Sequence, residues 1–202
     1  MAEKPSFEYC SVRFLEQWVR REKRLYEAFS TTPTPEDICE ALSYFKVSRN
    51  FAGIDNPGKQ KLVLASLKAT LTNSKLPGAN GKVCALAKKF EQDFKFFNLS
   101  AASKLLWLSS RTPFIIYDRR AVKALRSFRF YFQDRDYDAY TNAWRTQFNS
   151  CAKAIGAATR KLPKVKAFMH PSIRFDPKLV KTIREPWFKE RVFDLYLWET
   201  GE

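Results

Sequence analysis

The chain has 202 residues, 45% of them hydrophobic, and carries a formal net charge of +15. This length suits one domain, and this apolar content excludes a disordered chain. The charge indicates a polyanionic partner, with a basic solvated surface as the alternative. No stretch is long enough to span a membrane, and no apolar run of the signal-peptide type follows Met1. We therefore expect a cytoplasmic, nucleoid-associated protein.

The residues that commonly hold metals or act as nucleophiles are few and scattered. The four cysteines, none of them in a Cys-x-x-Cys pair, are Cys10, Cys39, Cys84 and Cys151. Their dispersion predicts reduced core thiols rather than disulfides or a zinc site. His170 is the single histidine, which argues against a transition-metal site and against a Ser–His or Cys–His nucleophile. Phosphate-loop, dinucleotide and zinc-deaminase motifs are also missing, so we expect neither a metal nor a cofactor.

Apolar residues recur at helical spacing along most of the chain, and capping signals mark several helix starts. Thr34-Pro35 and Asp176-Pro177 each place a capping side chain before a proline, which is typical of a helix N-terminus. Gly156 is expected to end the helix that precedes it. Helices are expected over residues 10–29, 35–46, 59–72, 83–97, 101–109, 119–129 and 144–155, then over 177–184 and from 186 onwards.

Four connections between these helices are expected, over residues 47–58, 76–81, 131–140 and 159–166. In the first, Arg49, Asn50 and Phe51 place a cation, an amide and a ring side by side, so it is a candidate functional loop, with an ordinary connection as the alternative. Residues 131–140 are aromatic and acidic and predict a turn. Residues 159–166 are strongly basic. They are interpreted either as a loop that contacts phosphate groups or as a loop that is merely solvated.

Strand-like alternation is nearly absent, and the one β-rich run, Phe114-Ile115-Ile116-Tyr117, is too short to build a sheet. The chain has no internal repeat, no low-complexity segment and no convincing domain linker. The sequence therefore predicts an all-α fold, a compact multi-helix domain of roughly eight helices that spans residues 1–202.

Residues 98–100 end one expected helix and cap the next, which predicts a helical hairpin. Lys104 follows, in the largely apolar stretch Ala101–Leu108. One interpretation is a surface lysine whose stem covers apolar neighbours while its amine reaches water. The other is an amine activated by desolvation and nearby cations, and therefore a nucleophile.

Asp118 stands between the apolar run 114–117 and a basic helix. It suits an N-cap that accepts a backbone N–H bond. The same position suits a catalytic carboxylate, because a helix N-terminus fixes the direction of such a group. Arg119, Lys123, Arg126 and Arg129 follow at spacings of 4, 3 and 3, which puts them on one helix face. Like charges on one face are stabilised by an anionic partner such as a phosphate backbone.

The hairpin, then Ser103-Lys104-Leu105-Leu106-Trp107, then Phe114-Ile115-Ile116-Tyr117-Asp118-Arg119-Arg120-Ala121, resembles the helix-hairpin-helix DNA glycosylase superfamily. The likeness is closest to its compact prokaryotic 8-oxoguanine-DNA-glycosylase-like branch and covers about residues 83–126. It implies a hairpin at about 97–101, a lysine at Lys104 and a catalytic carboxylate at Asp118. The sequence Asn98-Leu99-Ser100-Ala101 replaces the superfamily's Gly-x-Gly, and the four-cysteine iron–sulfur motif is missing, so no cluster is expected.

The resemblance implies an enzyme that flips a modified or damaged base out of duplex DNA and cleaves its N-glycosidic bond. Some similar compact proteins act on modified phage DNA in bacterial defence. In this interpretation Trp107 and Tyr117 line or support the base pocket, with core packing as the alternative for Trp107, and Arg49 and Asn50 fill the gap left by the base. The DNA-contacting residues expected beside these two are Asn98, Ser100, Ser103, Arg119, Arg120, Lys123 and Arg126.

Two other functions share the same charge. The main alternative is a helical DNA-binding module without catalysis, and a weaker one is an RNA-binding protein. For the glycosylase we expect a monomer that binds double-stranded DNA and that needs no membrane and no small-molecule cofactor.

Overall fold

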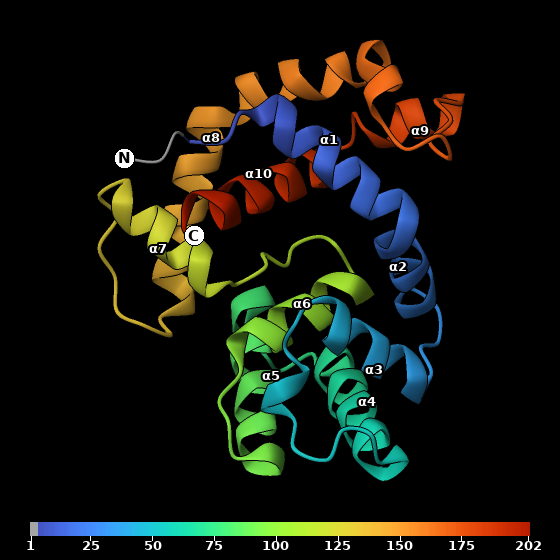
Figure 1. The fold of residues 1–202 in the computed structure, drawn as a ribbon. Helices are drawn as coiled ribbons and strands as arrows, with labels where there is room; N and C mark the ends of the chain where they lie inside the picture. The colour runs from blue at the N-terminus through green and yellow to red at the C-terminus, as the bar shows by residue number, and fades with distance from the viewer. Residues whose placement is uncertain (1–3) are drawn as a thin grey trace. The chain divides into compact units, whose positions relative to one another are not determined.

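The computed structural model describes residues 4–202, and the contacts divide the chain into two units. The first, called the terminal unit here, combines the N-terminal residues up to Lys23 with Asp118–Asp134 and Ala139–Glu202. The second, the central unit, combines Arg24–Tyr117 with Arg135–Asp138. Throughout residues 4–202 the regular structure is helical (Figure 1). The all-α prediction is therefore confirmed.

The terminal unit is built around α1 (Phe7–Gln17) and α10 (Pro186–Thr200), which pack on each other through aromatic rings. Ring centroids lie 4.8 Å apart for Phe14 and Phe188, and 5.1 Å apart for Trp144 of α8 and Phe193 of α10. The other helices of this unit are α7 (Arg119–Ser127), a 3₁₀ helix (Leu162–Phe168), α9 (Pro177–Thr182) and α8 (Tyr137–Lys161), whose first two residues belong to the central unit. Several of the chain's aromatic rings therefore pack in the core of this unit.

Buried charges cross the interior of the terminal unit. A π-helical turn, Trp18–Glu22, extends α1 and carries Glu22, which is 0% exposed. Arg191 of α10 donates from Nε and Nη2 to the two carboxylate oxygens of Glu22, at 3.1 and 3.0 Å. Arg191 also donates from Nη1 to Asp194, whose other oxygen accepts from the Trp144 indole at 2.8 Å. Burial raises the pKa of Asp194 to about 7, against the opposing effects of Arg191 and Trp144.

The central unit packs four helices around apolar side chains. They are α3 (Pro35–Tyr44), α4 (Pro57–Thr72), α5 (Gly78–Phe94) and α6 (Leu99–Ser109), preceded by α2 (Lys23–Phe29), which begins at the last residue of the terminal unit's first segment. A 3₁₀ turn, Ser48–Asn50, connects α3 to α4 and is followed by the buried ring of Phe51. That ring packs edge-on against Phe90 and Phe94 of α5, with centroids 5.0 and 4.9 Å away. The aromatic side chains thereby anchor the connection 47–58.

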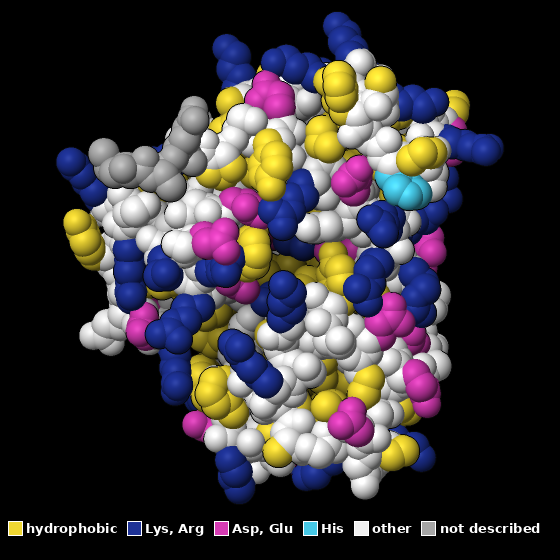
Figure 2. All heavy atoms as spheres, viewed as in Figure 1, with side chains coloured by type: hydrophobic (Ala, Val, Ile, Leu, Met, Phe, Trp, Pro, Cys, Tyr) yellow, Lys and Arg dark blue, Asp and Glu magenta, His cyan; other side chains and the backbone are white. Residues whose placement is uncertain are grey.

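Lys and Arg side chains are spread widely over the face drawn in Figure 2, with acidic side chains between them. Of the described residues, no helix combines the length and the apolar character that crossing a bilayer requires.

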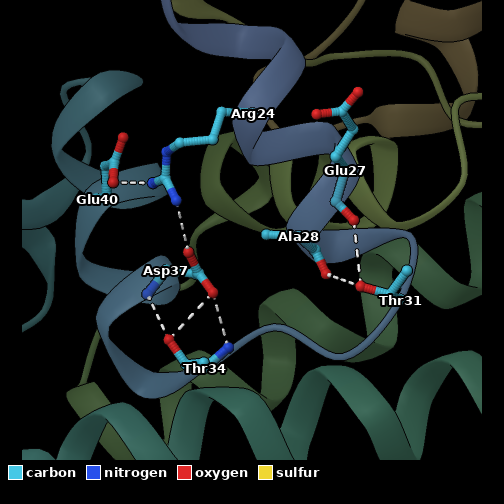
Figure 3. A network of polar contacts seen from close by, with 7 residues as sticks. All are labelled: Arg24, Glu27, Ala28, Thr31, Thr34, Asp37 and Glu40. Atoms are coloured by element: carbon cyan, nitrogen blue, oxygen red, sulfur yellow. Dashed lines mark hydrogen bonds and ion pairs between the residues drawn. The ribbon is translucent and has the colours of Figure 1, made fainter.

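The start of α3 shows how a local signal determines a helix end (Figure 3). The Thr34 hydroxyl accepts from the Asp37 backbone N–H at 3.3 Å, and the Asp37 carboxylate accepts from the Thr34 backbone N–H at 2.9 Å. Arg24 donates to Asp37 at 3.1 Å and also pairs with Glu40. Burial opposes ionisation of Asp37, but the hydrogen bonds from Thr34 and Arg24 together outweigh it and lower its pKa. The predicted cap is confirmed, as a reciprocal capping box.

We expect Thr34→Ala to lower the free energy of unfolding by about 1 kcal/mol, because it removes the hydroxyl that accepts from the first turn of α3. Thr34→Ser keeps that hydroxyl and is the matched control, with an expected change under about 0.5 kcal/mol. Urea denaturation of the two variants measures both values. Equal losses would show that the hydroxyl does not contribute.

Several predicted boundaries are wrong. Gly156 does not end a helix: α8 continues to Lys161, since Ile155 and Ala158 on either side are buried and compensate for the cost of a helical glycine, about 1 kcal/mol. The expected turn 131–140 and basic loop 159–166 both shorten, because α8 starts at Tyr137 and the chain after Lys161 forms a 3₁₀ helix. The loop 76–81 ends early, since the Gly81 N–H bonds to the Pro77 carbonyl and closes the first turn of α5.

Candidate functional site

The residues predicted for the hairpin join α5 to α6 in the central unit. Helix α5 ends at Phe94, and its C-cap, Lys95, adopts the left-handed conformation with φ of 63° and donates its N–H to the Glu91 carbonyl. Asn98 then caps α6 by accepting from the Ala101 N–H at 3.0 Å. The predicted cap is thus confirmed, and α6 begins at Leu99, two residues earlier than expected.

The polar side chains expected to contact DNA at this connection are largely buried. The side chains of Asn98 and Ser103 are buried, whereas Ser100 is half-buried. Ser103 accepts from the Tyr117 backbone N–H at 2.9 Å and donates to the Ser100 carbonyl at 3.2 Å. Asn98 and Ser103 therefore hold backbone N–H groups, those of Ala101 and Tyr117, in place. Of the three side chains, Ser100 is the one that is partly accessible.

Lys104 is buried in α6, with 5% of its surface exposed. Its Nζ donates to the Ser100 hydroxyl at 2.8 Å and lies 5.6 Å from the centroid of the Phe45 ring. The interpretation of Lys104 as a surface lysine whose amine reaches water is therefore wrong. The amine instead contacts a hydroxyl of its own helix and a ring of the loop that follows α3. The i, i+4 spacing of Ser100 and Lys104 is the sequence signal that could have identified this pair.

Asp118 caps α7 in the terminal unit. Its Oδ1 accepts from the Arg120 backbone N–H at 3.0 Å, and the side chain is half-buried. The predicted N-cap is therefore confirmed. The apolar run before it lies in the central unit, where Phe114 and Ile116 are buried and the Ile115 carbonyl accepts from the Tyr137 hydroxyl. The bond from the first turn of α7 restricts the direction of this carboxylate.

The C-terminal end of α10 supports α7 beside Asp118. Gly201 lies so close to the Arg120 carbonyl that a Cβ there would stand 1.9 Å from the oxygen. Arg120 lies over the ring of Trp198, with 4.0 Å from guanidinium carbon to centroid, and pairs with Glu202 at 3.0 Å. Arg120 therefore serves the packing of α7 on α10.

The predicted four-cation face of α7 is wrong. The helix ends at Ser127, and Arg129 lies beyond it with φ of 69°. Arg126 contacts the segment that follows α7: it donates to the Phe132 carbonyl at 2.9 Å and pairs with Asp134 at 2.7 Å. Arg119 and Lys123 remain exposed, one turn apart on the same face.

The remaining predicted site residues divide between surface and core. Arg49 is exposed and Asn50 half-buried on the 3₁₀ turn, where the buried Phe51 holds them. Tyr117 is half-buried, with its ring centroid 6.4 Å from that of Tyr137. Trp107 is fully buried in α6, which is the packing role named above as the alternative.

Comparison with known proteins adds nothing to these residues: no family model, no curated protein and no solved structure matches the chain.

Proposed function

We propose that the protein is a DNA glycosylase of the helix-hairpin-helix kind, which removes a modified or damaged base from duplex DNA. The observation that carries the proposal is Asp118, a carboxylate directed by the first turn of α7. The exposed cations Arg119 and Lys123 follow it on the same helix and would contact phosphates of the DNA backbone. The net charge of +15 supports the same partner.

In the proposed reaction the target nucleotide leaves the base stack. The bond between C1′ of the sugar and the base nitrogen breaks, and positive charge develops on the sugar. Asp118 would stabilise that charge and orient a water. The water oxygen forms the new bond to C1′, its proton goes to the departing base, and an abasic site remains. Neither a metal nor a cofactor is needed for these steps.

The test is a screen for abasic sites. The full chain is incubated with duplexes that carry oxidised bases, alkylated bases or the hypermodified bases of phage DNA, and abasic sites are cleaved with alkali and counted. Base release from one class identifies the substrate, and release from phage DNA alone would support a role in defence. As part of this proposal, the protein acts in the cytoplasm as a monomer.

Lys104 is expected not to form a covalent intermediate. A nucleophilic amine must reach C1′, whereas this amine is buried and turned to Ser100 of its own helix. Adding borohydride during turnover should therefore trap no protein–DNA complex, and intact strands with abasic sites should accumulate. A trapped complex that disappears in Lys104→Met would contradict this and would make the enzyme a lyase as well.

One observation favours a second function, a DNA-binding module without catalysis. Capping of α7 alone accounts for the position of Asp118. If duplex DNA binds but no substrate of the screen yields abasic sites, this second function replaces the first.

A further inference from the structure

The largest concentration of positive charge outside the residues discussed above lies in residues 160–184 of the terminal unit. This stretch contains eight Lys or Arg residues and one acid, so it holds +7 of the net charge of +15. The eight cations, all exposed, are Arg160, Lys161, Lys164, Lys166, Arg174, Lys178, Lys181 and Arg184. Within residues 4–202, one of these cations forms an ion pair: Lys161 pairs with Glu8 at 2.8 Å. The single acid, Asp176, accepts from the Leu179 N–H and caps α9.

An aromatic ring stands out from this basic stretch. Phe168 is 86% exposed, although its neighbour Met169 and Leu162 at the start of the 3₁₀ helix are buried. Non-helical dihedrals at Val165 interrupt the 3₁₀ helix between Leu162 and Phe168. The ring is therefore presented outward by a segment whose two ends are anchored in the core.

Polar contacts hold the same segment on α1. The His170 backbone N–H donates to the Glu16 carboxylate at 3.1 Å, and the His170 ring bonds to the Ser172 hydroxyl at 2.7 Å. In Figure 2 the histidine is the cyan side chain, with dark blue Lys and Arg side chains around it. These contacts hold the backbone two residues after the exposed ring in place.

An anchored ring among cations fits one class of partner. Phosphates along a nucleic-acid strand neutralise the cations, and an unpaired base offers a face on which an aromatic ring stacks. A paired duplex offers such a face only at its ends. Binding to a membrane surface grows with the buried apolar area, and in residues 160–184, all described, Phe168 is the one large hydrophobic side chain that is exposed.

We propose that residues 160–184 bind single-stranded nucleic acid, with phosphates on Lys164 and Lys166 and a base stacked on Phe168. Residues 160–184 include neither Asp118 nor α7, and binding there requires no base excision. The inference therefore stands or falls independently of the glycosylase.

The test measures binding of a labelled, unmodified single-stranded oligodeoxynucleotide to the full chain by fluorescence anisotropy. Phe168→Ala should weaken binding about tenfold, because one stacked base is lost. Tyr131→Ala is the matched control, since Tyr131 is 85% exposed in the same unit but outside the stretch, and it should bind like the wild type. A strand of abasic residues should bind wild type and Phe168→Ala equally, because it has no base to stack.

The cations are tested with two double variants that each remove two positive charges. Lys164→Ala with Lys166→Ala should weaken binding and lower the slope of log affinity against log salt by about 1.4, or about 0.7 for each lost phosphate contact. Lys61→Ala with Lys68→Ala, two exposed lysines of α4, should leave the slope unchanged. Wild-type affinity in Phe168→Ala would overturn the proposal. So would Phe168-dependent binding to anionic lipid vesicles without Phe168-dependent binding to the oligonucleotide.

Discussion

Asp118→Asn is expected to slow base excision about a hundredfold or more and to leave the folded state almost as stable as the wild type. Asparagine caps a helix about as well as aspartate, so its Oδ1 still accepts from the Arg120 N–H and the unfolding free energy should change by less than about 0.5 kcal/mol. It carries no charge, however, and cannot stabilise a cationic sugar. Loss of such a preorganised electrostatic group lowers the rate about a hundredfold or more. The two measurements are urea denaturation and the rate of abasic-site formation on the substrate that the screen identifies.

Two further substitutions separate the cap from the catalyst. Asp118→Ala removes both roles and should cost about 1 kcal/mol in stability in addition to the activity. Asp176→Asn is the matched control, because Asp176 caps α9 with a 2.7 Å bond from the Leu179 N–H. It should leave the excision rate unchanged. If Asp118→Asn excises bases at the wild-type rate, Asp118 is a helix cap and the catalytic group lies elsewhere.

Arg191→Met is expected to cause the largest loss of stability. Arg191 makes two hydrogen bonds to Glu22, which is 0% exposed, and one to Asp194. Without the guanidinium, the Glu22 carboxylate stays buried with its main counter-charge removed. Breaking a buried pair in this way costs about 3–5 kcal/mol, because the remaining charge is desolvated without compensation. Urea denaturation of the variant measures the loss.

A control and a rescue test this account. Lys89→Met removes the exposed i, i+4 pair with Asp93 and should cost under about 1 kcal/mol. Adding Glu22→Gln to Arg191→Met replaces the buried carboxylate with a neutral amide. This second substitution should recover part of the lost free energy of unfolding. A loss below about 1 kcal/mol in Arg191→Met would show that Glu22 finds another way to be neutralised.

Interactions between residues close in sequence were predictable. Each predicted helix cap has its hydrogen-bond partner two or three residues away, so a short motif contains the whole bond. The helical class follows from apolar spacing for the same reason. The pairing of Ser100 with Lys104 also lies within about one turn of helix, but the two interpretations of Lys104 drawn from the sequence did not include it. The residues that form these caps are Thr34, Asn98, Asp118 and Asp176.

Other features depended on residues far away in sequence. Arg126 was expected to face DNA, but the loop after α7 brings Asp134 to it. The division into two units was not visible either, because the chain passes between them within α2, after Tyr117, and on each side of residues 135–138. A boundary made by several crossings leaves no single linker of distinctive composition to find.

Three properties could be derived from the amino-acid sequence alone: the helical class, the strong positive charge, and Asp118 as the N-cap of α7, because composition and short-range hydrogen bonds decide them. Three others became visible in the fold: Lys104 is buried, Gly156 continues a helix, and Phe168 is exposed between the buried residues Leu162 and Met169. Burial depends on which distant side chains pack against a residue, and no local pattern contains that information.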